Sequence, residues 1–226
     1  MVGVGIFEPL FIGGIGVELI YSFIIIVCSL MIYHATREMY ELTSYKGIKY
    51  FRQAFLFFAI AFFFRYSIRF FLVLLGINGL REISPVPFGI LTSFVFLYLS
   101  SMTVFCLLYS VMWKKWNHDK IRIYVFNIAA FAIALIGTVF SSIGTYLILN
   151  VILLAFVLIS LLVAHRDRKK RGGLFIIYTL LFIFWTLNVI DILIPQFLEL
   201  YQMVIYLASV FLFMLILYKV LKKTGD

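Results

Sequence analysis

Four charged residues lie inside long apolar stretches of this 226-residue sequence, and they are the residues best suited to binding chemistry. They are Glu18, Arg65, Arg69 and Asp191. A lone charge at the middle of a membrane costs about 3 kcal/mol, so such a residue faces neighbouring helices and pairs there. We predict that Arg69 pairs with Glu18 and that Arg65 or Arg69 also reaches Asp191. Guanidinium groups at the floor of a pocket suit a carboxylate, a phosphate or a lipid headgroup.

Uncharged polar and aromatic residues at similar depth extend this candidate site. Trp185, Asn188 and Asp191 are spaced three apart, so they share one broad helix face. Asn150 and Tyr206 lie at comparable depth in two other apolar stretches. The competing interpretation is a structural ion-pair network that only fixes helix packing. The sequence therefore predicts a polar pocket or ion-pair network formed by Glu18, Arg65, Arg69, Asp191, Asn188, Trp185, Asn150 and Tyr206.

The elements that must position these residues are membrane-spanning helices. Apolar residues make up 65% of the chain and charged residues 13%, whereas soluble domains have about half and a quarter. Stretches of about 20 apolar residues cross a bilayer as helices, because lipid offers the backbone no hydrogen-bond partner. We predict an all-α polytopic membrane protein, a single seven-helix bundle over residues 1–226, with spans at 11–33, 51–76, 88–112, 123–140, 145–164, 174–194 and 200–221.

The basic residues predict how this bundle is oriented. Of the 19 Lys and Arg residues, 16 fall after the first, third and fifth spans or at the end of the chain, and the other connections hold only Arg81. Short basic loops stay in the cytoplasm. The N-terminus is therefore expected outside and the C-terminus inside, which makes the predicted pocket face outward. Arg37 and Glu41 are four residues apart, so the first helix is expected to continue past its span.

Charge and motif content limit the cofactors and partners. The net charge of +9 is explained by membrane topology, so we expect contact with membrane lipids and no nucleic acid. His34, His118 and His165 lie at the predicted cytoplasmic boundary without a ligand-spacing motif, so no metal site is predicted. The sequence has no GxSxG, HExxH or P-loop motif, and we expect that the protein is not an enzyme.

The predicted size and topology are similar to those of microbial rhodopsins. Seven helices in 226 residues, with the N-terminus outside, match the architecture of that family. The resemblance implies a Schiff-base lysine in the middle of the seventh helix. Here that stretch reads LASVFLFMLIL and contains no lysine. Covalent retinal is therefore excluded, and no cofactor is predicted.

Three functions remain open for such a bundle. The first is a receptor-like sensor in which a small anionic or lipidic ligand enters the pocket from outside. Its signal would pass through the basic loops to a cytoplasmic or membrane partner protein, because the short loops leave no room for an output domain. The alternatives are a small secondary transporter and a non-catalytic assembly or scaffold subunit. The expected location is the cell membrane, as a multi-pass protein of a prokaryotic plasma membrane.

The orientation can be tested with two reporters fused after Asp226. A fluorescent protein at that position should fluoresce in whole cells, and alkaline phosphatase there should be inactive, because both would lie in the cytoplasm. Active phosphatase together with a dark fluorescent fusion would show the opposite orientation.

Overall fold

The protein is described by a computed structural model for residues 12–77, 85–115, 119–140, 142–166, 168–194 and 199–225. Side chains are described for residues 19–67, 89–114, 121–140, 142–166, 174–194 and 201–224. Apart from one turn of 3-10 helix at Trp113–Lys115, the secondary structure of these residues is entirely α-helical. The helices are α1 Ile12–Thr43, α2 Lys46–Ile77, α3 Pro85–Met112, α4 Asp119–Val139, α5 Ile143–Arg166, α6 Arg168–Leu193 and α7 Glu199–Gly225.

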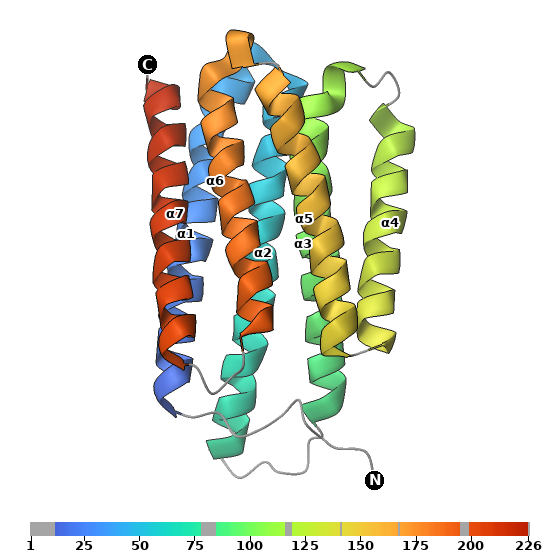
Figure 1. The fold of residues 1–226 in the computed structure, drawn as a ribbon, viewed down its shortest axis with the longest axis vertical. Helices are drawn as coiled ribbons and strands as arrows, with labels where there is room; N and C mark the ends of the chain where they lie inside the picture. The colour runs from blue at the N-terminus through green and yellow to red at the C-terminus, as the bar shows by residue number, and fades with distance from the viewer. Residues whose placement is uncertain are drawn as a thin grey trace.

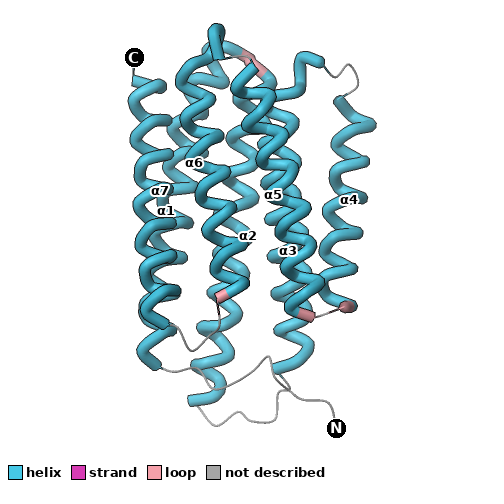
Figure 2. The backbone as a smooth tube through the Cα atoms, in the orientation of Figure 1, coloured by secondary structure: helices cyan, strands magenta, loops and turns pink. Residues whose placement is uncertain are grey.

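All seven helices are long and apolar enough to cross a membrane. Each satisfies its backbone hydrogen bonds internally, which lipid requires. Figure 2 shows that the described chain is helical except for short connections. The predicted all-α, seven-helix membrane bundle is confirmed.

The helices extend beyond the predicted spans. Helix α1 continues past Tyr33 to Thr43, and its last turns contain an ion pair in which Arg37 Nε lies 2.7 Å from Glu41 Oε1. The predicted extension of the first helix is therefore confirmed. Helix α6 likewise begins at Arg168, inside the predicted connection. The reason is that an apolar stretch stops at the first charges, whereas helical hydrogen bonds continue through the interface, where water and headgroups solvate charged side chains.

Six of the helices form a closed ring, and the seventh packs outside it. The order of the helices around the ring is α1, α2, α3, α5, α6 and α7, and each helix contacts the next, with α7 contacting α1 (Figure 1). Helix α4 packs mainly on α3. The share of buried residues is 17% in the apolar stretch of α4 and 56% in that of α3. Helix α4 is thus the peripheral element, and the interior of the ring is where a site can form.

The ring has two chemically different ends. Helices α1, α3, α5 and α7 end on the same side as the C-terminus, at the top of Figure 1. We call this side the basic end, because the sequence places 16 of the 19 Lys and Arg residues there. The opposite side is called the far end. Basic side chains at the basic end pack on aromatic rings, as when Arg52 Cζ lies 4.5 Å from the Tyr33 ring centroid.

Aromatic rings fill the middle of the ring of helices. Phe58 of α2 stacks on Phe213 of α7 with ring centroids 5.2 Å apart. Phe184 of α6 meets Phe213 edge to face at 4.7 Å and Phe58 at 5.6 Å. All three side chains are buried. Such contacts hold membrane helices together by close packing, because lipid is as apolar as the core.

Short polar side chains along the helices hydrogen-bond to their own helix. Ser29 Oγ donates to the Ile25 carbonyl at 2.7 Å, and Ser160 Oγ donates to the Phe156 carbonyl at 2.9 Å. The hydroxyls of Thr103 and Thr186 likewise donate to the backbone carbonyl four residues earlier in their own helices. A hydroxyl satisfied in this way can be buried in an apolar bundle without a partner on another helix.

We predict that replacing Gly47 with alanine loosens the contact between α2 and α3. A Cβ at Gly47 would lie 2.7 Å from the Ser110 carbonyl oxygen and 3.0 Å from Trp113 Nε1. Overpacking of this kind costs about 1–3 kcal/mol, so thermal melting of the purified protein should occur at a lower temperature.

The matched control is Gly144→Ala, because a Cβ there meets no atom within 4 Å. It should leave the melting temperature unchanged or raise it, since alanine is a better helix former by about 1 kcal/mol. Equal melting temperatures for the two variants would contradict the close approach at Gly47.

Candidate functional site

Five of the residues predicted for the site line one pocket between the helices toward the far end. Arg65 comes from α2, Asn150 from α5, and Trp185, Asn188 and Asp191 from α6. The pocket has a volume of about 50 Å³. Residues far apart in the sequence are therefore brought together inside the ring. Further lining residues complete its wall: Phe58, Phe62, Phe96, Leu97, Ser100, Tyr146, Phe184 and Ile192.

The two charged residues of this pocket lie among aromatic rings. Arg65 Cζ lies 4.7 Å from the ring centroid of Phe96 and 5.7 Å from that of Tyr66. A guanidinium group over an aromatic face is stabilised by the ring quadrupole, which lowers the cost of placing it among helices. Tyr21 of α1 lies within electrostatic range of both Arg65 and Asp191. The opposite charges thus share one polar region.

Three uncharged residues of the pocket have hydrogen-bonding capacity available to a ligand. The amide nitrogens of Asn150 and Asn188 donate to carbonyls of their own helices, at 2.9 Å each. Each amide oxygen can still accept hydrogen bonds. The Trp185 side chain is 6% exposed, and its indole N–H has no acceptor among the described residues. Because a buried donor without an acceptor is costly, this N–H points to a missing acceptor such as a ligand oxygen.

The other predicted site residues are placed differently. Tyr206 of α7 does not line the pocket, but it stacks on Tyr21 with ring centroids 4.8 Å apart. The side chains of Glu18 and Arg69 lie outside the described residues. The pairing of Arg69 with Glu18, and the contact of either arginine with Asp191, therefore stay predictions.

The described side chains do not bring three metal-ligating groups together. No group of three His, Cys, Asp or Glu residues among them could hold a metal ion. His165 instead packs against the ring of Phe175, with ring centroids 5.0 Å apart. The chemistry that the pocket can support is recognition by charge and hydrogen bonding.

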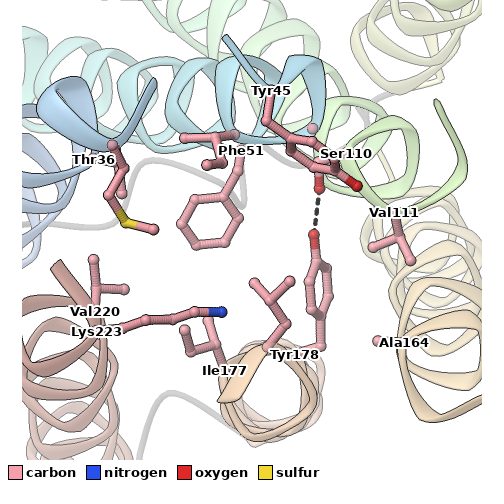
Figure 3. Close-up of a pocket in the computed structure, with 14 residues that line it drawn as sticks. Thr36, Tyr45, Phe51, Ser110, Val111, Ala164, Ile177, Tyr178, Val220 and Lys223 are labelled. Atoms are coloured by element: carbon pink, nitrogen blue, oxygen red, sulfur yellow. Dashed lines mark hydrogen bonds between the residues drawn. The ribbon is translucent and has the colours of Figure 1, made fainter. Parts of the chain in front are cut away.

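A second, larger cavity lies inside the ring at the basic end, and the sequence analysis missed it. Its volume is about 210 Å³. Figure 3 shows that residues from all six ring helices surround it, with Thr36 from α1, Phe51 from α2, Ser110 from α3, Tyr178 from α6 and Lys223 from α7 among them. Ala164 supplies the wall from α5. The two cavities thus occupy different halves of the same ring.

No sequence signal marks this larger cavity. Lys223 belongs to the basic tail, where its charge serves the topology prediction. Tyr178 and Ser110 are single polar residues in apolar stretches, and their hydroxyls hydrogen-bond to each other across 68 residues of sequence. That contact depends on how α3 and α6 pack, which periodicity does not reveal. Several residues that line the cavity are small or β-branched, such as Gly47, Ala164 and Val220. Residues of these types leave room for open space but do not predict it.

No family model matches the chain. The chain is similar to a protein of Archaeoglobus fulgidus described as uncharacterized, with 34% identity over 221 residues. The similarity covers 92% of this chain and 93% of the archaeal protein. Identity of this extent over almost the whole of both chains shows common descent, and this chain belongs to the same protein family as that archaeal protein.

Proposed function

We propose that this protein is a receptor-like binding module of the membrane whose far-end pocket recognises the acidic group of a small ligand. The observation that carries the proposal is the convergence of Arg65, Asn150, Asn188 and Trp185 in one pocket. The guanidinium and the indole N–H are both hydrogen-bond donors, so a carboxylate or phosphate oxygen could accept from each of them. Asp191 adds an acceptor for a donor group of the same ligand.

The size of the pocket decides how much of the ligand it holds. A cavity needs at least about 10–15 Å³ to hold one water molecule, and the pocket measures about 50 Å³. It therefore accommodates one polar group rather than a whole metabolite. The rings of Phe62 and Phe96 in its wall would contact an apolar portion attached to that group. A small anionic amphiphile or a lipid headgroup fits this combination.

The proposed signal route follows from the arrangement of the ends. With the basic end in the cytoplasm, the pocket is nearer the outer surface. Ligand binding between α2, α5 and α6 would shift the packing of these helices, and their shift would reach the basic end. The output would pass to a separate partner protein there. The archaeal relative supports a prokaryotic plasma membrane as the location.

We predict that Asn188→Leu removes the bound ligand without unfolding the bundle. Among the described residues, the Asn188 amide hydrogen-bonds to the Phe184 carbonyl of its own helix and to no other helix, so its loss affects the pocket more than the packing. Native mass spectrometry of wild-type protein, extracted gently from its own membrane, should show one added small-molecule mass. That mass should be absent from the variant.

The matched control is Thr186→Val, which changes a polar residue of α6 that does not line the pocket. Its hydroxyl also bonds within the helix, to the Phe182 carbonyl at 2.9 Å. The added mass should persist in this control. An added mass in Asn188→Leu, or none in the wild type, would contradict the proposal.

A secondary transporter is the second candidate, and the alignment of the two cavities favours it. Phe51 and Tyr178 line the cavity at the basic end, while Phe58 and Trp185 line the far-end pocket. On each of the helices α2 and α6, the residue that lines one cavity is seven positions from the residue that lines the other, which is about 10 Å along the helix axis. Phe58 and Phe184, which line the far-end pocket, pack on Phe213, so aromatic rings form part of the wall of that pocket. A closed barrier between two cavities is what alternating access requires.

Transport can be tested in proteoliposomes that contain a trapped pH-sensitive dye, with lactate as the test carboxylate. A transporter that carries one proton inward with each lactate anion should give lactate-dependent acidification of the lumen. Asp191→Asn should reduce it, because the pocket loses the carboxyl group that could hold that proton. Liposomes with Thr186→Val protein serve as the control. The absence of any flux above that of protein-free liposomes would remove this candidate.

A further inference from the structure

The cavity at the basic end is the most spacious feature inside the bundle that the proposed function does not use. At about 210 Å³, it exceeds the engineered cavity of about 150 Å³ that takes up benzene in another protein. It opens at the basic end, because Lys223 lines it and is solvent-exposed. Figure 3 shows the Lys223 nitrogen directed into the space between Thr36, Phe51 and Ile177.

The walls of this cavity are apolar, because their polar groups are already satisfied. Thr36 Oγ1 donates to the Ile32 carbonyl at 2.7 Å, and Ser110 Oγ donates to the Leu107 carbonyl at 2.8 Å. The Tyr178 hydroxyl donates to Ser110 Oγ, so that both hydroxyl protons are used. A polar ligand would find few partners here, whereas a hydrocarbon chain would lose nothing by desolvation.

The charged group that lines this cavity belongs to Lys223, near its open end at the basic end of the ring. Among the described residues that line the cavity, Lys223 alone is charged, and it stands in an end of the bundle rich in Lys and Arg. A cation at the open end of an apolar cavity complements an anion attached to a hydrocarbon chain. We propose that this cavity binds a single-chain anionic amphiphile, with the chain between α1, α2, α6 and α7 and the carboxylate at Lys223.

Other occupants fit less well. A peptide segment would bring backbone N–H and C=O groups into walls whose own polar groups are bonded, and each unsatisfied group is costly. A two-chain lipid needs more room than one narrow cavity inside a helix ring. The site is separate from the far-end pocket and its lining residues are different, so this inference does not rest on the proposed function.

The test is equilibrium dialysis of radiolabelled decanoate against the full-length protein in phosphatidylcholine nanodiscs, with empty nanodiscs subtracted. The wild type should bind decanoate in a saturable manner, with one site per chain that the Asn188→Leu variant retains. Octanoate should bind about fifteenfold more weakly at the same free concentration, since each methylene contributes about fourfold. Decanol should bind more weakly than decanoate, because it lacks the anion.

Two pairs of variants locate the site. Ala164→Phe fills the cavity and should abolish saturable binding, whereas Ala155→Phe, on an exposed face of the same helix, should not change it. Lys223→Gln should weaken binding about fivefold, the effect of one basic residue at an anionic surface. Lys222→Gln, which does not line the cavity, should have a smaller effect. Asn188→Leu should bind decanoate normally, which separates this test from that of the far-end pocket.

Several results would overturn the inference. The absence of saturable decanoate binding to the wild type would do so without any variant. Equal binding of decanol and decanoate would show that the mouth does not select an anion. Unchanged binding in Ala164→Phe would place the ligand elsewhere, and a dimer that dissociates only in Ala164→Phe would make a second copy of the chain the occupant.

Discussion

The membrane interior offers no water to hydrogen-bond with the protein, and the rest of this structure depends on that constraint. Every spanning segment is an α-helix, because only a helix satisfies its backbone within one segment. The same requirement governs short polar side chains: Ser29, Thr103 and Ser160 all hydrogen-bond to carbonyls of their own helices. Charged side chains need more than this. A backbone carbonyl can accept from an arginine, as the Tyr33 carbonyl does from Arg52 at 3.1 Å, but it does not neutralise the charge and offers no donor to the Asp191 carboxylate. They must meet other groups inside the ring.

The ring of six helices divides into parts with different chemistry. Toward the far end, Arg65 and Asp191 share a small polar pocket with amides and an indole N–H. In the middle, Phe58, Phe184 and Phe213 pack together without polar groups. At the basic end a larger apolar cavity opens beside Lys223. Such a sequence of polar pocket, aromatic barrier and apolar cavity suits recognition of molecules that carry both an acidic group and a hydrocarbon part.

The sequence predicted the fold and much of the far-end pocket, because both depend on local patterns. Apolar stretches set the number of helices, and estimated depth along each helix placed Arg65, Asn150 and Asp191 in overlapping parts of the membrane. Helix ends were less predictable, since the sixth predicted span begins at 174 whereas α6 begins at Arg168. The cavity at the basic end could not be predicted at all. It is an unfilled space at the centre of six packed helices. Its wall depends on contacts between helices, such as the hydrogen bond between Ser110 and Tyr178, and such contacts are set by packing.

The far-end pocket depends on Arg65 and Asp191 facing the same space inside the ring, since both line it. A double-mutant cycle on Arg65→Leu and Asp191→Leu, read as the free energy of unfolding, tests it most directly. If the two charges face one pocket, each single variant should lose about 3 kcal/mol, because it leaves the other charge uncompensated. The double variant should then recover most of that loss. Losses that simply add in the double variant would show that Arg65 and Asp191 are independent, and the account of the far-end pocket would be wrong.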